Sequence, residues 1–395
     1  MKEFIYADNA ATTRLSDYAL EAMLPYLKDH YGNASSLYAI GRDAHQAVET
    51  ARKKIASLIN AGPMDIYFTS CGTESDNWVM KGIARKLKKE GKSHIITSVI
   101  EHHAILHSAK SLEEDGFDVT YIPVDEKGRV SADDVKAAIR PDTALVSIMY
   151  ANNEIGTIQP ISEIGAICRE AGVLFHTDAV QAAGTLPIDV EAQNIDMLSV
   201  SAHKFHGPKG IGMLYCRRGI YPDNLLAGGA QERGHRAGTE NVAYIVGMAA
   251  AFEEACGMME EKGKRLAKLR DRIQEGLLKI PGTRVNGDEE HRLPGTLNVS
   301  FEKIDGESLL FDLDLKGIAV SSGSACASGS VDPSHVLLAI GVPYQMAHGS
   351  LRISLGRYNT EEDADRIIES VTEAVKMLSC LLYTSSRHKR YRGVL

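Results

Sequence analysis

Short apolar runs alternate with segments of helical pattern along the first part of the chain. We predict strands at residues 65–69, 94–99, 144–150, 173–176, 197–201 and 211–215. These runs are largely apolar at consecutive positions, which is typical of strands buried on both faces of a sheet. Helical patterns lie at residues 74–89, 132–139 and 161–171. The alternation predicts an α/β fold with a mainly parallel sheet that helices cover on both sides.

The pattern changes after Asn241. A long helical stretch follows at residues 242–278, with Gly257 as the expected break. Shorter strands are predicted at residues 295–301, 318–321 and 350–354, and an amphipathic helix at residues 361–378. We therefore predict a large domain over residues 15–256. A smaller α+β domain is predicted from residues 257–379 together with residues 1–14.

Composition narrows the possible functions. The chain has 395 residues, of which 44% are hydrophobic, so it can bury a large core without metal or disulfide staples. Its 52 acidic residues outnumber its 44 basic ones, which argues against a general nucleic-acid binder. No stretch approaches the roughly 20 apolar residues of a membrane-spanning helix.

The six cysteines are scattered without a CxxC pair, so neither a zinc site nor a disulfide framework is indicated. We expect a cytoplasmic protein of enzyme size, with no resident metal, no nucleic acid and no membrane partner.

Polar clusters follow the ends of several predicted strands, where parallel sheets bind their ligands. The first cluster spans residues 70–77 and precedes a helix. The backbone N–H groups around Gly72 and the hydroxyl of Thr73 are suited to hold a phosphate group. Taken alone, such a cluster is more often a helix cap without a ligand.

Two further clusters contain an acid and a lysine. Asp178 follows one predicted strand, and Lys204 follows a later one. Pyridoxal phosphate requires a lysine for its Schiff base and a carboxylate beside its pyridinium nitrogen. Lys204 lies between two histidines and before a Gly-Pro turn, which is unusual for a solvated surface lysine. His102 follows another strand, and beside a cofactor it can stack on the ring and shuttle protons.

With these motifs the chain resembles the fold-type I pyridoxal-phosphate enzymes of the class V aminotransferase group, and within them the NifS/IscS-type cysteine desulfurases. The resemblance runs from Ile5 to about Leu378. The most specific motifs are SAHKFHGP, RAGTEN, SSGSACA and LRISLGRY, which begin at residues 201, 236, 321 and 351. The resemblance implies the α/β fold of type I pyridoxal-phosphate transferases. In that fold a large domain holds a mainly parallel seven-stranded sheet, and a smaller α+β domain accompanies it.

The resemblance also implies roles for individual residues. Lys204 forms the Schiff base with pyridoxal 5'-phosphate, Asp178 pairs with the pyridinium nitrogen, and Gln181 bonds the phenolate oxygen. His102 stacks on the ring. The cofactor phosphate is held by Gly72, Thr73, Ser201 and His203, joined by Thr239 from the second subunit of a homodimer. Asn153 and Arg352 hold the substrate carboxylate, and an Arg–carboxylate pair suits an amino acid.

Cys326 is the expected nucleophile. It lies in a run of Ser, Gly, Ala and Cys at residues 321–330, which has too little apolar surface for a regular element and should be mobile. Buried packing is the expectation for the other native cysteines, which are Cys71, Cys168, Cys216 and Cys256. By resemblance, Cys326 takes sulfur from L-cysteine as a persulfide and alanine is released. The sulfur then passes to an acceptor such as an iron–sulfur scaffold, with only a transient contact between Cys326 and a cluster.

Two other functions stay open at this point. One is another class V enzyme, an aminotransferase or selenocysteine lyase, that uses Lys204 and Asp178 but not Cys326. The other is a non-catalytic scaffold that keeps the fold for interaction.

The last stretch, residues 380–395, is basic and lacks the helical pattern before it. Its first letters, CLLYTS, match what the mosaic end of a sequencing transposon encodes in one frame. We therefore expect a non-native tail and assign no role to Cys380.

Overall fold

The computed structural model describes residues 4–322 and 333–391, with side chains described as far as residue 380 in the last helix. Within that part, the main sheet has seven strands in the order β2-β8-β7-β6-β5-β3-β4. Their bounds are Ile66–Thr69, His94–Ser98, Asp118–Ile122, Thr143–Ser147, Leu174–Asp178, Met197–Ser201 and Gly212–Cys216 for β2 to β8. Strands β7, β6, β5, β3 and β4 pair in parallel, and β8 runs antiparallel to both β2 and β7. The predicted mainly parallel sheet is confirmed.

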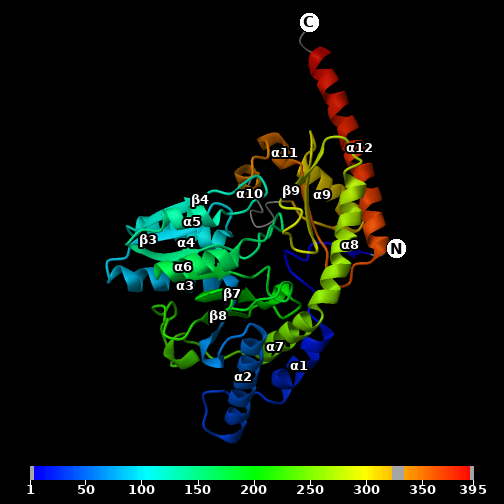
Figure 1. Cartoon of the computed structure of the whole chain (residues 1–395). Helices are drawn as coiled ribbons and strands as arrows, with labels where there is room; N and C mark the ends of the chain where they lie inside the picture. Colours follow the sequence, from blue (N-terminus) through cyan, green and yellow to red (C-terminus); the bar gives the residue numbers. More distant parts are fainter. Residues whose placement is uncertain (1–3, 323–332, 392–395) are drawn as a thin grey trace.

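Helices cover both faces of this sheet (Figure 1). The helices of this part are α1 Asp17–Lys28, α2 Ala39–Leu58, α3 Gly72–Lys88, α4 His103–Glu114, α5 Ala132–Ala138, α6 Ile161–Ala171 and α7 Val242–Gly257. Apolar residues of α2, α5, α6 and α7 pack with one face of the strands, and those of α3 and α4 pack with the other. Ile95 and Ile96 enter opposite clusters, because neighbouring side chains of a strand point to opposite faces.

A second, smaller group of elements forms its own core. An antiparallel sheet joins β12 Ser350–Ser354, β10 Thr296–Phe301 and β9 Thr283–Asn286, and β1 Ile5–Tyr6 pairs in parallel with β11 Ile318–Ala319. Its helices are α8 Met259–Leu277, α9 Gly306–Leu315, α10 His335–Ala339, α11 Tyr344–His348 and α12 Glu361–Tyr391. The apolar cluster of this part unites Ile5 and Ala7 with residues between 266 and 375. The division into two domains at residues 15–256 stays a prediction.

The helical pattern after Asn241 is confirmed, including its break, since α7 ends at Gly257 and α8 begins at Met259. The expectation that the last stretch is not helical was wrong, because α12 continues as far as Tyr391. Residues 379–391 contain neither proline nor glycine, so nothing in this stretch stops a helix once it has begun.

No single helix in the described ranges is long and apolar enough to cross a membrane. Helices α7 and α8, which meet at a sharp bend, reach the length and apolar composition of a membrane span only when the two are taken together. Most residues of α7 are buried.

A buried ion pair fixes the loop that contains the RAGTEN motif. Arg52 of α2 forms two hydrogen bonds of 2.8 Å with the carboxylate of Glu232, and both side chains are 3% exposed. The backbone N–H of Phe68 in β2 also donates to Glu232. Farther along the same loop, Arg236 pairs with Glu74 in the first turn of α3 at 2.8 Å. The loop is thereby tied to α2, to β2 and to the first turn of α3.

We expect Glu232→Ala to lower the free energy of unfolding by about 3–5 kcal/mol, because it leaves the Arg52 charge buried without a partner. Urea denaturation of the two proteins measures this difference. The matched control is Lys54→Ala in the same helix, which removes a half-exposed pair with Glu253 and should cost about 1 kcal/mol or less. Equal losses in both variants would contradict the role given to the buried pair.

Candidate active site

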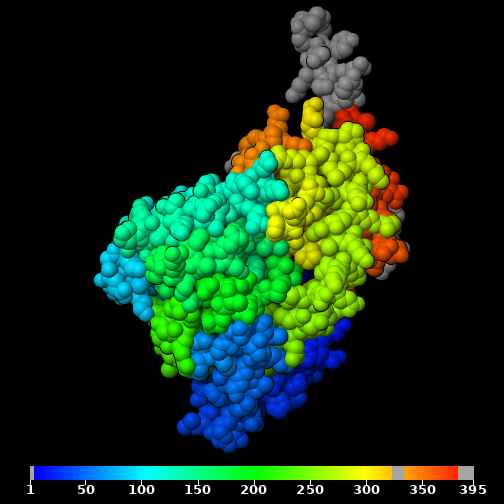
Figure 2. Space-filling view, in the orientation of Figure 1, coloured from blue at the N-terminus to red at the C-terminus, as the bar shows by residue number. Residues whose placement is uncertain are grey.

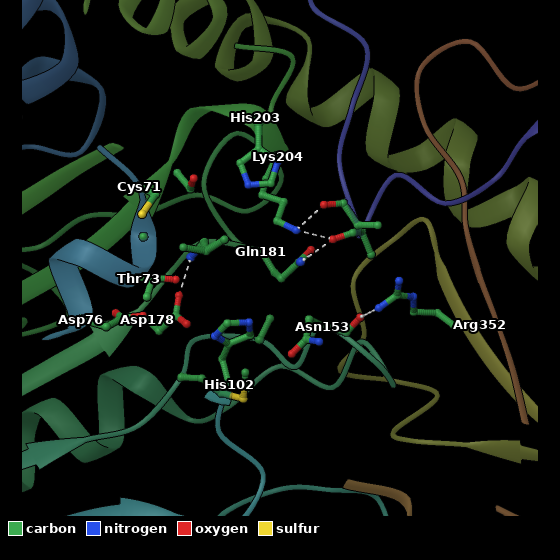
Figure 3. Close-up of a pocket in the computed structure, with 17 residues that line it drawn as sticks. Cys71, Thr73, Asp76, His102, Asn153, Asp178, Gln181, His203, Lys204 and Arg352 are labelled. Atoms are coloured by element: carbon green, nitrogen blue, oxygen red, sulfur yellow. Dashed lines mark hydrogen bonds between the residues drawn. The ribbon is translucent and has the colours of Figure 1, made fainter. Parts of the chain in front are cut away.

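A cavity of about 370 Å³ opens at the carboxyl ends of the parallel strands. It brings together most of the residues selected from the sequence (Figure 3). These are Gly72, Thr73, His102, Asn153, Asp178, Gln181, Ser201, His203, Lys204 and Arg352. Thr239 is exposed and is not among the cavity-lining residues. Cys326 lies outside the described residues.

Asp178, the last residue of β6, forms part of the cavity floor. It is only 6% exposed, and its Oδ1 accepts a hydrogen bond of 2.9 Å from the backbone N–H of Val180. Burial raises the pKa of Asp178, while its electrostatic interactions with His102 and Lys204 act in the opposite direction. The acidity of Asp178 therefore reflects burial that these two neighbours partly offset.

A second buried acid, Asp76 of α3, also lines the cavity. Burial and the negative charge of Asp178 raise the pKa of Asp76 well above its usual range. His176 is 3.7 Å from Asp76, but burial lowers the pKa of this imidazole to about 3, so it is uncharged. Two adjacent buried carboxyl groups cannot both ionise at low cost. His102 and Lys204 partly offset the effect of burial at Asp178, so Asp178 is the more readily ionised of the two.

Lys204 ends the short 3₁₀ turn Ala202–Lys204 that follows β7. Its Nζ donates to the carbonyl oxygens of Ala10 at 2.5 Å and Ala11 at 2.8 Å. Gln181 donates to the same Ala10 oxygen at 3.0 Å. Figure 3 shows both side chains converging on this N-terminal segment. The carbonyl groups hold the lysine at the cavity until another partner takes their place.

His102 lies on the opposite side of the cavity and caps helix α4. Its Nδ1 accepts a hydrogen bond of 3.1 Å from the backbone N–H of Ala104. Because an accepting nitrogen carries no proton, the neutral ring carries its proton on Nε2. Figure 3 shows the ring pointing into the cavity. Nε2 is thus the atom available for proton exchange with a bound molecule.

The start of α3 forms one end of the cavity. Its N-cap residue, Cys71, makes no side-chain cap hydrogen bond, so the first turn keeps its capacity to bind an anion. A Cβ atom at Gly72 would lie 2.6 Å from Cγ2 of Val180. Only glycine allows the helix to approach this closely. Ser201, at the end of β7, lies at the same end of the cavity.

Arg352 of β12 reaches the cavity from the smaller group of elements. It is 2% exposed, and its guanidinium donates to Asp8 Oδ1 at 2.8 Å and to the carbonyl oxygen of Asn153 at 3.1 Å. The third nitrogen of the same group, Nε, is buried and has no hydrogen-bond partner in the described part of the chain. The site therefore depends on how the two groups of elements are joined.

Cys71 was expected to be ordinary packing, and this was wrong. It is half-buried and lines the cavity, whereas Cys168 and Cys216 are buried as expected. The sequence reasoning also missed the two buried acids nearby, Asp76 and Glu101. Asp76 lies within an ordinary amphipathic helix, where no pattern marks it. Glu101 is next to His102, and an acid between an apolar run and two histidines was the available signal.

A lysine, a buried aspartate and an uncapped helix start around one cavity define a fold-type I pyridoxal-phosphate site. The class V aminotransferase family model matches residues 5–367, and the chain belongs to this family. A "Cysteine desulfurase IscS" from Methanosarcina thermophila is 58% identical over 95% of this chain and 92% of its own length. Another from Clostridium botulinum is 54% identical over 95% of each chain.

Solved structures agree with this assignment. A "NIFS-LIKE PROTEIN" superposes with a TM-score of 0.90 at 42% identity, over 95% of this chain and all of its own. A structure titled "SspA in complex with cysteine" has a TM-score of 0.80 at 39% identity, over 90% of this chain and all of its own. The predicted fold type is confirmed.

Pyridoxal phosphate is the cofactor of this family, and the residues present fit it. The uncapped start of α3 is open to a phosphate, and the carboxyl group of Asp178 at the same cavity is suited to a pyridinium nitrogen. Among the described residues, no group of three or more His, Cys, Asp or Glu side chains is arranged to hold a metal ion.

Glu101 makes stability depend on pH. It is fully buried, and burial raises its pKa to about 8 although Ser98 and the N–H of Met149 donate to it. The folded protein therefore binds a proton that the unfolded chain releases, so stability falls as pH rises from about 4.5 to about 8. We expect Glu101→Gln to lose less stability than the wild type between pH about 4.5 and about 8.

Urea midpoints at several pH values measure this slope. Glu90→Gln, at an exposed position, is the control and should keep the wild-type slope. A slope that is unchanged in Glu101→Gln would show that Glu101 is already ionised in the folded protein.

Proposed function

We propose that this chain is a cysteine desulfurase, which converts L-cysteine to L-alanine and places the sulfur on Cys326 as a persulfide. The observation that carries the proposal is the single cavity that unites Lys204, Asp178 and His102 with Arg352. A lysine and an acid alone would suit many reactions of the class. The arginine adds a site for the carboxylate of an amino acid, and relatives named cysteine desulfurase match nearly the whole chain.

In the proposed reaction, Arg352 and Asn153 bind the substrate carboxylate. The guanidinium is already held by Asp8 and by the carbonyl of Asn153, so little freedom is lost when the substrate arrives. The bound cofactor supplies an electron sink that makes the α-proton of the amino acid labile. Lys204 takes this proton at Nζ, and the negative charge of Asp178 holds the positive charge of the cofactor ring nitrogen. Gly72, Thr73, Ser201 and His203 hold the phosphate.

Sulfur transfer requires the thiolate of Cys326. Its Sγ attacks the substrate Sγ, so a sulfur–sulfur bond forms while the bond between the substrate Cβ and Sγ breaks. The electron pair of the broken bond stays with the three-carbon fragment, which takes up protons and leaves as alanine. Nε2 of His102 carries the ring proton and is placed to donate it to the substrate. The persulfide on Cys326 is then passed to an acceptor protein.

Iron–sulfur cluster assembly is the proposed use of this sulfur, with a scaffold protein as the acceptor. The five cysteines in the described part of the chain are free thiols. This state suits a reducing compartment, so we place the enzyme in the cytoplasm.

A homodimer is the proposed working form. Helix α1 and the segment after it lie at one end of the molecule (Figure 1 and Figure 2) and expose large apolar side chains. They are Leu20, Leu24, Leu27, Tyr31, Leu37, Tyr38 and Ile40, all at least 40% exposed. A second copy is the proposed occupant, because Thr239 is exposed and outside the cavity of its own chain. Thr239 is then available to the phosphate site of the partner.

We expect Leu27→Glu to shift the protein toward a monomer and to weaken cofactor retention, because a charge would be buried in the apolar contact. Sedimentation velocity measures the first effect and cofactor absorbance the second. Phe311→Glu, at a 72% exposed apolar position on α9, is the control and should remain dimeric. A wild-type protein that sediments as a monomer would contradict the dimer.

The function is tested by measuring alanine and sulfide release from L-cysteine in the presence of a reductant. We expect Lys204→Ala to lose activity together with the yellow cofactor band. Cys326→Ala should keep the band but lose at least about 100-fold in activity, because the nucleophile is gone. Cys380→Ala removes an exposed thiol and should match the wild type. Full activity in Cys326→Ala would rule out the persulfide route.

A further inference from the structure

The chain on either side of residues 323–332 contacts the residues that bind the substrate carboxylate. Before this segment, Ser321 exchanges two backbone hydrogen bonds with Arg352, of 3.1 and 2.7 Å. After it, the hydroxyl of Ser334 is hydrogen-bonded to Oε2 of Glu154. Glu154 directly follows Asn153, whose carbonyl oxygen accepts from Arg352. The described residues on both sides of residues 323–332 are thus hydrogen-bonded to the proposed carboxylate site or to the residue next to it.

The geometry around Ser334 fixes the direction of its hydrogen bond to Glu154. Ser334 caps α10, and its Oγ accepts from the backbone N–H groups of Val336 at 3.1 Å and Leu337 at 3.3 Å. The single proton of the hydroxyl is therefore directed to Glu154. A hydrogen bond of this kind, with an acidic acceptor and both partners buried, is among the stronger ones in proteins.

Glu154 is itself held in place. Its side chain is buried, at 6% exposure. Its backbone N–H donates to Oδ1 of Asn152 at 2.8 Å, and its carbonyl oxygen accepts from Asn298 at 3.2 Å. The same Asn152 donates to the carbonyl of Ile100 at 3.0 Å. These contacts fix Glu154 both to the large sheet and to β10. The start of α10 is thus hydrogen-bonded to a residue whose position is fixed.

We propose that Glu154 is a positioning residue for sulfur transfer. Through Ser334 it fixes the start of α10 beside the carboxylate site of Asn153 and Arg352. Cys326 precedes Ser334 by eight positions in the sequence. The inference rests on the proposed function, because it assigns Cys326 and the carboxylate site the roles given there. Glu154 does not touch the reacting atoms, so it acts only through the contacts described.

Apolar packing keeps α10 folded when this hydrogen bond is removed. Val336, Leu337 and Ile340 are buried in one cluster with Ile100 and Met149. His335 adds a contact of 3.1 Å from Nε2 to the carbonyl oxygen of Glu101. Loss of the Ser334 hydroxyl should therefore loosen the start of α10 without unfolding it, and small displacements near a reacting centre lower rates strongly.

The test is the rate of persulfide formation in a single turnover of the cofactor-loaded enzyme with L-cysteine. We expect Ser334→Ala to slow this step about tenfold, with the KM for L-cysteine within about twofold and the cofactor band unchanged. Glu154→Ala should have the same effect. The double variant should be no slower than either single variant, because both remove one interaction. Ser334→Thr keeps the hydroxyl and should restore the rate.

Ser131→Ala is the matched control, since Ser131 caps α5 in the same way at a site away from the cavity. It should leave the rate unchanged. If Ser334→Ala and Glu154→Ala both form the persulfide at the wild-type rate, this inference is overturned and the proposed function is not. The same holds if the losses of the two single variants add in the double variant. A wild-type enzyme that forms no persulfide would overturn the proposed function and this inference with it.

Discussion

Two buried carboxyl groups lie side by side under the cavity, and the chemistry of the site depends on how their charge is shared. Burial raises the pKa of both Asp178 and Asp76. Lys204 and His102 partly offset this effect at Asp178, and the imidazole of His176 beside Asp76 is uncharged. An unbalanced buried charge is costly. Asp178 is therefore the more readily ionised of the two, at the place where a pyridinium nitrogen needs a negative charge.

The topology of the fold brings Asp178 close to Lys204 and Arg352. Parallel strands end at one edge of the sheet, so β6 and β7 deliver Asp178 and the turn with Lys204 to the same place. The smaller group of elements then contributes Arg352, which is fixed to Asp8 and Asn153. A site built at such a junction can bind cofactor with one part and substrate with the other. The Glu154–Ser334 contact extends this junction toward Cys326.

Much of this arrangement was accessible from the sequence, because strands of consecutive apolar residues and polar residues at their ends are local signals. The lysine, the aspartate and the phosphate cradle were found in this way, and resemblance added Gln181 and Asn153. Asp76, Glu101 and Glu154 were not singled out, since their importance arises from burial and from neighbours distant in sequence. Helix α12 was predicted too short, because an amphipathic pattern ended at residue 378 although no helix-breaking residue follows before 391. The position of Cys71 on the cavity wall also depended on tertiary structure.

The central claim is that sulfur from L-cysteine is deposited on Cys326. Mass spectrometry of cysteine-containing peptides, after brief exposure of the holoenzyme to L-cysteine without reductant, tests it directly. The account predicts one added sulfur atom on the peptide that contains Cys326 and none on the others. Cys71 is the sharpest comparison, because it lines the cavity itself. Added sulfur on the Cys71 peptide, with none on that of Cys326, would contradict the account.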